Sequence, residues 1–115
     1  MKDDELDQVL IDTFNVNPKQ TRRHVFRVRG LEFLKLRDVL LKMGHIVTEN
    51  FDAQEYVATI GAGFLNSNTA YIAFKLEGNE LYVSVSAKEG LISQHTCEGA
   101  VNELKNNLKE FIEEE

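Results

Sequence analysis

Residues 70–87 read AYIAFKLEGNELYVSVSA, and this stretch decides the fold. Apolar residues alternate with polar or small ones on both sides of Gly78-Asn79, and a Gly-Asn pair between two such runs predicts a tight β-hairpin. If these two residues form the loop, Phe74 pairs with Val83. That register brings the apolar side chains of both strands to one face, so the hydrophobic pattern and the turn predict the same pairing.

Two further segments carry the same two-residue alternation and extend the predicted sheet. Residues 55–65 alternate up to an Asn-Ser-Asn turn, and residues 21–29 alternate up to Gly30. Residues 45–52 could be extended but carry mixed signals. The pattern therefore predicts an antiparallel sheet of about four strands, each with one apolar face.

Two segments before the hairpin repeat apolar residues at helical spacing. Residues 3–15 predict a short amphipathic helix. Residues 31–43 are apolar around more than half of the helix circumference, which predicts a well-covered helix. Gly44 follows at the position where a left-handed C-terminal cap is expected.

A last helix is predicted after the hairpin, with Ser93 or Thr96 as its cap. Its acidic end opposes the helix dipole, so residues 113–115 are expected to fray. Its buried stripe is expected to consist of Cys97, Ala100, Val101, Leu104, Leu108, Phe111 and Ile112.

The element order α-β-α-β-β-β-α predicts an α+β fold. The economical packing is a two-layer sandwich, an antiparallel sheet of about four strands with two main helices on one face. Residues 1–17 are interpreted as an N-terminal amphipathic helix and linker, and residues 18–115 as a single α+β domain. The sequence leaves open whether the first helix packs on this domain, swaps onto a second copy or holds a partner.

The bulk composition is that of an ordinary globular chain. The hydrophobic fraction of 43% and the charged fraction of 28% argue against global disorder. One cysteine cannot form an internal disulfide, and no apolar run follows Met1 or approaches the length of a membrane span. These features predict a cytoplasmic protein with no membrane association.

Charge is distributed unevenly along the chain. Residues 19–45 contain all five arginines and carry a net charge of +6, whereas residues 1–18 carry −4 and residues 46–115 carry −8. A basic island in an acidic protein offers a docking place for an acidic partner, and the acidic remainder of the chain is itself a candidate for that partner.

Alternation along the strands predicts what the second face of the sheet, opposite the two main helices, displays. This face carries basic residues on one strand and aromatic residues at two positions, and its other residues are small. The candidate binding residues are Arg23, Arg27, Arg29, Tyr71, Lys75 and Tyr82.

Protein docking is the leading interpretation of this face, because small residues allow close approach and tyrosines are rigid anchors. It implies a non-catalytic binding module that acts as a homodimer or within an assembly. The alternative is a nucleic-acid binder in which arginines hold phosphates and tyrosines stack on bases. A solvated face without function and a small apolar ligand between sheet and helices also stay open.

No motif in the chain predicts catalysis, a metal or a cofactor. His95 and Cys97 are two residues apart, so they would not face each other on a helix. The Gly61-Ala62-Gly63 stretch lacks the third glycine and the Lys-Ser or Lys-Thr of a phosphate loop. One cysteine and three scattered histidines match no zinc-ligand spacing. We therefore expect no enzyme activity and no cofactor.

Overall fold

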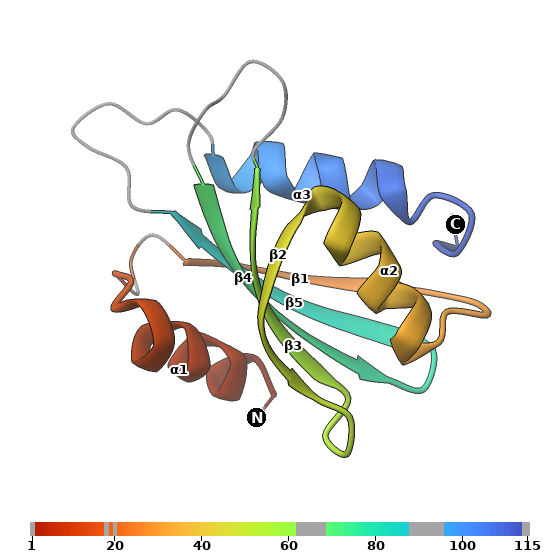
Figure 1. Ribbon diagram of the computed structural model, residues 1–115, viewed down its shortest axis with the longest axis horizontal. Helices are drawn as coiled ribbons and strands as arrows, with labels where there is room; N and C mark the ends of the chain where they lie inside the picture. The colour runs from red at the N-terminus through yellow and green to blue at the C-terminus, as the bar shows by residue number, and fades with distance from the viewer. Residues whose placement is uncertain (1, 18, 20, 62–68, 88–95, 114–115) are drawn as a thin grey trace.

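The computed structural model describes residues 2–17, 19, 21–61, 69–87 and 96–113. Within these residues the order is α-β-α-β-β-β-β-α, and the helices pack on an antiparallel sheet, so the predicted α+β class is confirmed (Figure 1). The elements are α1 (Lys2–Phe14), β1 (Thr21–Arg27), α2 (Phe33–Met43), β2 (Gly44–Asn50), β3 (Glu55–Gly61), β4 (Thr69–Glu77), β5 (Glu80–Ala87) and α3 (Thr96–Asn107).

The five described strands lie in the spatial order β1-β5-β4-β3-β2, and every neighbouring pair is antiparallel. The predicted hairpin register is confirmed, because Phe74 pairs with Val83 across β4 and β5. Gly78, in the two-residue loop, has a φ of 59°, a left-handed conformation that costs glycine little. The end of the predicted 55–65 strand lies outside the described residues beyond Gly61.

Strand β2 makes the sheet one strand larger than the sequence predicted. It follows α2 directly, and its pairing with β3 shifts between Ile46 and Thr48, a β-bulge that breaks the two-residue alternation. The predicted left-handed cap at Gly44 is wrong, because its φ of 177° is extended backbone. Glycine is needed there for space, since an added Cβ would overlap the carbonyl oxygen of Thr59.

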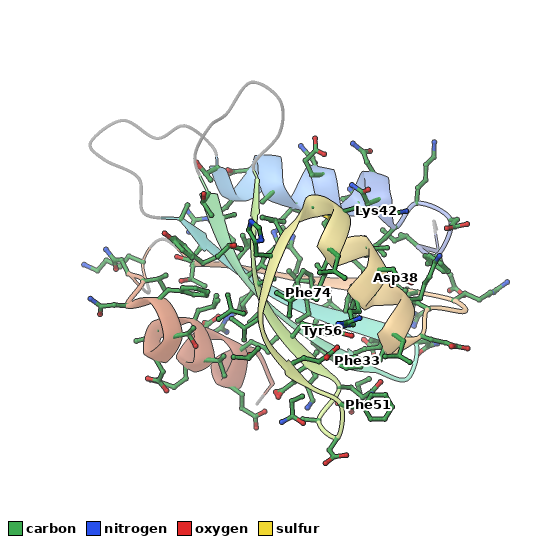
Figure 2. All side chains as sticks on the ribbon, in the orientation of Figure 1. Phe33, Asp38, Lys42, Phe51, Tyr56 and Phe74 are labelled. Carbon is green, nitrogen blue, oxygen red and sulfur yellow. The ribbon has the colours of Figure 1, made fainter. Side chains whose placement is uncertain are left out.

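Helices α2 and α3 cover one face of the sheet, as predicted, and the main core lies between them and the strands. Phe33 of α2 stacks on Tyr56 of β3 with ring centroids 4.0 Å apart (Figure 2). The Tyr56 hydroxyl donates a hydrogen bond to the Phe33 carbonyl oxygen at 2.8 Å, so the buried phenol is satisfied.

Helix α1 packs on the opposite face and adds a third layer to the predicted sandwich (Figure 1). Leu6 and Leu10 are fully buried against Val57 of β3 and Ala73 of β4. Together with Val16, these four residues form a second, smaller core. The small residues on this face therefore receive the chain's own helix, which is the first of the three alternatives left open for α1.

The C-terminal segment departs from the predicted helix. Helix α3 ends at Asn107, and Ile112 forms an isolated antiparallel bridge with Val28, just beyond β1. Glu113 was expected to fray, and that prediction is wrong. Its N–H donates to the Arg27 carbonyl oxygen at 2.9 Å, because Phe111 and Ile112 pack against the main core and hold the backbone beside β1.

Candidate functional site

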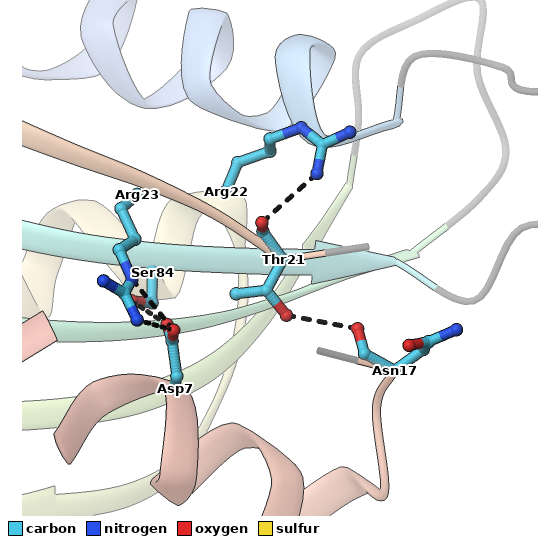
Figure 3. A network of polar contacts seen from close by, with 6 residues as sticks. All are labelled: Asp7, Asn17, Thr21, Arg22, Arg23 and Ser84. Atoms are coloured by element: carbon cyan, nitrogen blue, oxygen red, sulfur yellow. Dashed lines mark hydrogen bonds and ion pairs between the residues drawn. The ribbon is translucent and has the colours of Figure 1, made fainter. Parts of the chain in front are cut away.

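The face predicted to bind a partner is largely occupied by α1. Arg23 and Ser84 are register partners on β1 and β5, and both side chains reach one carboxylate, that of Asp7 in α1. The Arg23 Nε atom donates to Asp7 Oδ2 at 2.9 Å, and Ser84 Oγ donates to Asp7 Oδ1 at 2.8 Å (Figure 3). The acidic first segment is thus one partner of the basic island.

The aromatic candidates also contact the chain itself. Tyr71 packs against Phe14 of α1 with ring centroids 4.6 Å apart, and Tyr82 packs against the same small core. Lys75 donates a hydrogen bond from Nζ to the Ala53 carbonyl oxygen at 3.0 Å. These three predicted site residues support the fold, and an external ligand would have to share or displace their contacts.

The remaining candidates, Arg27 and Arg29, lie along and just beyond the outer edge of β1. Arg29 Nε donates to Glu113 Oε1 at 2.9 Å. The exposed Arg27 guanidinium makes no hydrogen bond or ion pair within the described part of the chain. The six predicted residues are therefore split between a covered face and a sheet edge, and they do not form one open site.

A second surface was missed because α2 was predicted to be well covered. Leu34 and Leu41 keep 58% and 51% of their surface exposed. They are seven residues apart, which places them roughly 20° apart around the helix, on one stripe. Leu36, Val39 and Leu40 occupy the buried side. The helical spacing of the two exposed leucines was the signal that could have separated them from the core set.

Phe51, in the turn between β2 and β3, extends this apolar surface at the N-terminal end of α2 (Figure 2). Its ring is 60% exposed and meets Phe33 edge to face at 5.7 Å between centroids. Leu34 and Phe51 line a surface hollow of about 370 Å³. A smaller hollow of about 170 Å³ lies between α1 and strands β2 and β3, below the usual range for small-molecule pockets.

Charged side chains flank the leucine stripe of α2. Arg37 lies on one side, where its Nε is 3.1 Å from Glu49 Oε2 of β2. Asp38, also exposed, lies on the other side of the stripe. The helix thus presents two leucines with a cation along one border and an anion along the other.

Two titratable side chains have shifted pKa values, and both shifts have structural causes. Burial lowers the pKa of His24 from its ordinary value of 6.5, and the nearby positive charge of Lys105 adds to this effect. Burial, followed by the neighbouring Glu49 carboxylate, raises the pKa of the Tyr56 phenol. The His24 ring stacks parallel to that of Phe26.

Cys97 is partly buried against the main core, with its Sγ 3.8 Å from the Val85 carbonyl oxygen. His95, two residues earlier in the chain, lies outside the described residues. Among the residues that the structure describes, no group of three or more metal-ligating side chains is gathered, and no helix is long and apolar enough to cross a membrane.

Comparison of the chain with protein-family models, with curated proteins and with solved structures finds no match.

Proposed function

We propose that this protein is a non-catalytic binding module that forms a homodimer through the exposed face of α2. The observation that carries the proposal is the pair Leu34 and Leu41, two more-than-half-exposed leucines on one stripe of a helix whose other side is core. Of the five large hydrophobic side chains that are exposed among the described residues, four belong to α2, β2 or the turn after β2, so this apolar exposure is concentrated in one region.

A second copy is the occupant favoured by the pattern on this helix. If two α2 helices cross antiparallel with the twofold axis between Arg37 and Asp38, Leu34 of each protomer faces Leu41 of the other. The same axis brings each Arg37 near the partner's Arg37 and each Asp38 near the partner's Asp38, so the apolar positions and not the charges favour this contact. Twofold interfaces require a surface that is complementary to itself, and the leucine stripe meets that requirement in its apolar positions.

The two Arg37 side chains near the axis are each paired within their own protomer. The Arg37 Nε atom lies 3.1 Å from Glu49 Oε2. This ion pair partly neutralises each arginine and so weakens the repulsion between them.

The helix stripe alone predicts a weak dimer. Burying a leucine fully contributes about 1.5–3 kcal/mol, and these leucines are already half buried, so four of them contribute about 4 kcal/mol. Association of two proteins costs about 4–15 kcal/mol. Phe51 and the adjacent hollow must therefore add buried area, and we expect dissociation in the micromolar range or above.

Light scattering on the eluting protein, over a concentration series, tests the proposal. The wild-type mass should rise toward twice the monomer mass of 13.1 kDa as concentration increases. Leu34→Ser combined with Leu41→Ser should hold the protein at the monomer mass. Val25→Ser is the matched control, because Val25 is 49% exposed but lies on β1. A wild type that stays monomeric at millimolar concentration would reject the dimer.

Nucleic-acid binding, the alternative drawn from the sequence, has less support. It would use Arg23, Tyr71 and Lys75. The first two already contact α1, and Lys75 already donates to the Ala53 carbonyl oxygen. It predicts binding of a single-stranded probe that weakens steeply with salt and is lost in Arg23→Ala with Arg27→Ala. Absence of a shift in a gel at low salt would remove it.

A further inference from the structure

The outer edge of β1 is a second surface with a recognisable partner chemistry. We infer that this edge binds an extended acidic segment of another protein as an additional antiparallel strand. The inference does not depend on the α2 dimer, because β1 and β2 lie at opposite ends of the strand order.

Strand β1 has the regular backbone that strand addition needs. Its register with β5 runs without a shift from Thr21 to Arg27. Strand β2, the other edge of the described sheet, carries a bulge, which is a common way to block edge pairing. The two edges are therefore not equivalent, and β1 is the one that can accept a partner strand in continuous register.

The chain's own C-terminal segment already uses part of this edge in the same way. Arg29 N–H donates to the Phe111 carbonyl oxygen at 2.7 Å, and Glu113 N–H donates to the Arg27 carbonyl oxygen at 2.9 Å. The Val28–Ile112 bridge between them is antiparallel. The backbone at this edge is thus accessible to a passing strand.

The backbone of β1 presents further groups in the same direction. Val28 N–H points the other way, toward β5, where it donates to the Asn79 carbonyl oxygen at 2.8 Å. Because the direction of peptide groups alternates along a strand, Arg23 and Val25 direct theirs outward, as Arg27 does. A guest strand along residues 21–26 would find these groups in place.

Charge determines which guest fits. The Glu113 carboxylate accepts a hydrogen bond from Arg29, so the one strand-like neighbour that this edge has in the described structure is acidic. Arg22 and Arg27 extend the positive charge along β1, one on each face of the strand, and both are exposed. Among the described residues, Arg22 donates to the backbone carbonyl oxygens of Lys19 and Thr21, at 3.3 and 3.2 Å. Both guanidiniums can thus take up carboxylates from a guest.

A second copy of β1 is a poor occupant of this edge. Two β1 strands paired antiparallel would set arginines opposite or diagonal to arginines, and like charges in cross-strand positions are destabilising. Charged edge residues also protect sheets from unspecific pairing. Arginines at an edge exclude neutral and basic strands, and they leave an acidic strand as the permitted guest.

The test uses the full-length protein and a fluorescently labelled peptide of alternating glutamate and valine, with binding followed by fluorescence anisotropy. We expect saturable binding that weakens with salt. A lysine–valine peptide should not bind. An acidic peptide with proline in place of its central valine should bind about tenfold more weakly, because it lacks a central N–H donor.

Two variants locate the binding on β1. Arg22→Gln with Arg27→Gln should weaken binding about tenfold, and Lys35→Gln with Lys42→Gln on α2 is the control with the same change in charge. Val25→Pro should also weaken it, because proline removes an outward N–H that the β1–β5 ladder does not use. Circular dichroism confirms folding of each variant. Equal binding of the lysine and glutamate peptides, undiminished binding by the arginine variant, or no binding of the acidic peptide would overturn the inference.

Discussion

Asp7 and Arg23 join the first helix to the first strand, with the Arg23 Nε atom 2.9 Å from Asp7 Oδ2. The two residues belong to segments of opposite net charge in the sequence, and their contact places α1 on the face that was expected to be open. Ser84 completes the contact from the neighbouring strand. The acidic N-terminal segment thus acts as an internal partner of the basic island.

Removing the Asp7 carboxylate should loosen α1. Asp7→Asn is expected to cost about 1–2 kcal/mol of unfolding free energy, because three hydrogen bonds to a charged group are weakened while the half-exposed Arg23 returns to water. Urea unfolding measures the change. Asp12→Asn is the control, since exposed Asp12 contacts only Gln8 of the same helix in the described structure. Equal costs for the two variants would contradict the proposed role of Asp7 in docking α1.

Gly44 should tolerate alanine poorly because the methyl group would meet the Thr59 carbonyl at the start of the β2–β3 pairing. We expect Gly44→Ala to cost about 3 kcal/mol or more. Gly78→Ala should cost only about 1 kcal/mol, since nothing lies within 4 Å of the added Cβ and the penalty comes from a φ of 59°. Denaturant unfolding compares the two, and the reverse order would show that β2 is not docked as described.

Folding stability should fall in mildly acidic solution because of His24. Burial and Lys105 lower its pKa below 6.5, so the unfolded chain binds a proton more readily than the folded one. The contribution of neutral His24 is therefore complete above pH 6.5 and is lost as the pH falls through the lowered pKa. His24→Gln should flatten this part of the stability profile, measured by unfolding at several pH values. An unchanged profile would contradict the assignment.

Neutralising Asp38 tests the facing of like side chains across the proposed twofold axis. Asp38→Asn should strengthen self-association about twofold or more, because it removes the repulsion between two Asp38 carboxylates. Asp12→Asn on α1 is the control with the same change in charge. Sedimentation velocity measures the dimer fraction. If the two variants dimerise alike, Asp38 does not lie at the interface.

The hairpin could be predicted from sequence because the Gly78-Asn79 loop and the alternating residues around it constrain the same register. The main core could be predicted as well, because the apolar faces of the strands and of two helices must be buried against each other. Strand β2 could not be predicted, because a bulge between Ile46 and Thr48 disrupts the alternation that identifies a strand. Gly44 was wrongly interpreted as a left-handed cap, because a glycine can be required either for a left-handed conformation or for lack of space for a side chain.

The candidate site was harder to predict than the fold. The alternation of side chains along the strands correctly placed Arg23, Tyr71 and Ser84 on the face away from α2 and α3. Alternation does not reveal which other segment of the chain covers that face. The small residues Ala73, Ser84 and Ser86 were read as room for a partner, and all three are buried in the monomer. The backbone contacts of Glu113 depend on where α3 ends, which a continuous apolar stripe does not show.

Site-directed cross-linking between protomers tests the central claim most directly. In a Cys97→Ser background, Leu34→Cys protein mixed with Leu41→Cys protein and treated with a short bismaleimide should give abundant covalent dimer. Leu34→Cys protein alone should give little, because the two copies of that position lie at opposite ends of the antiparallel contact. Equal yields from the mixture and from the single variants, or none from either, would contradict dimerisation through α2.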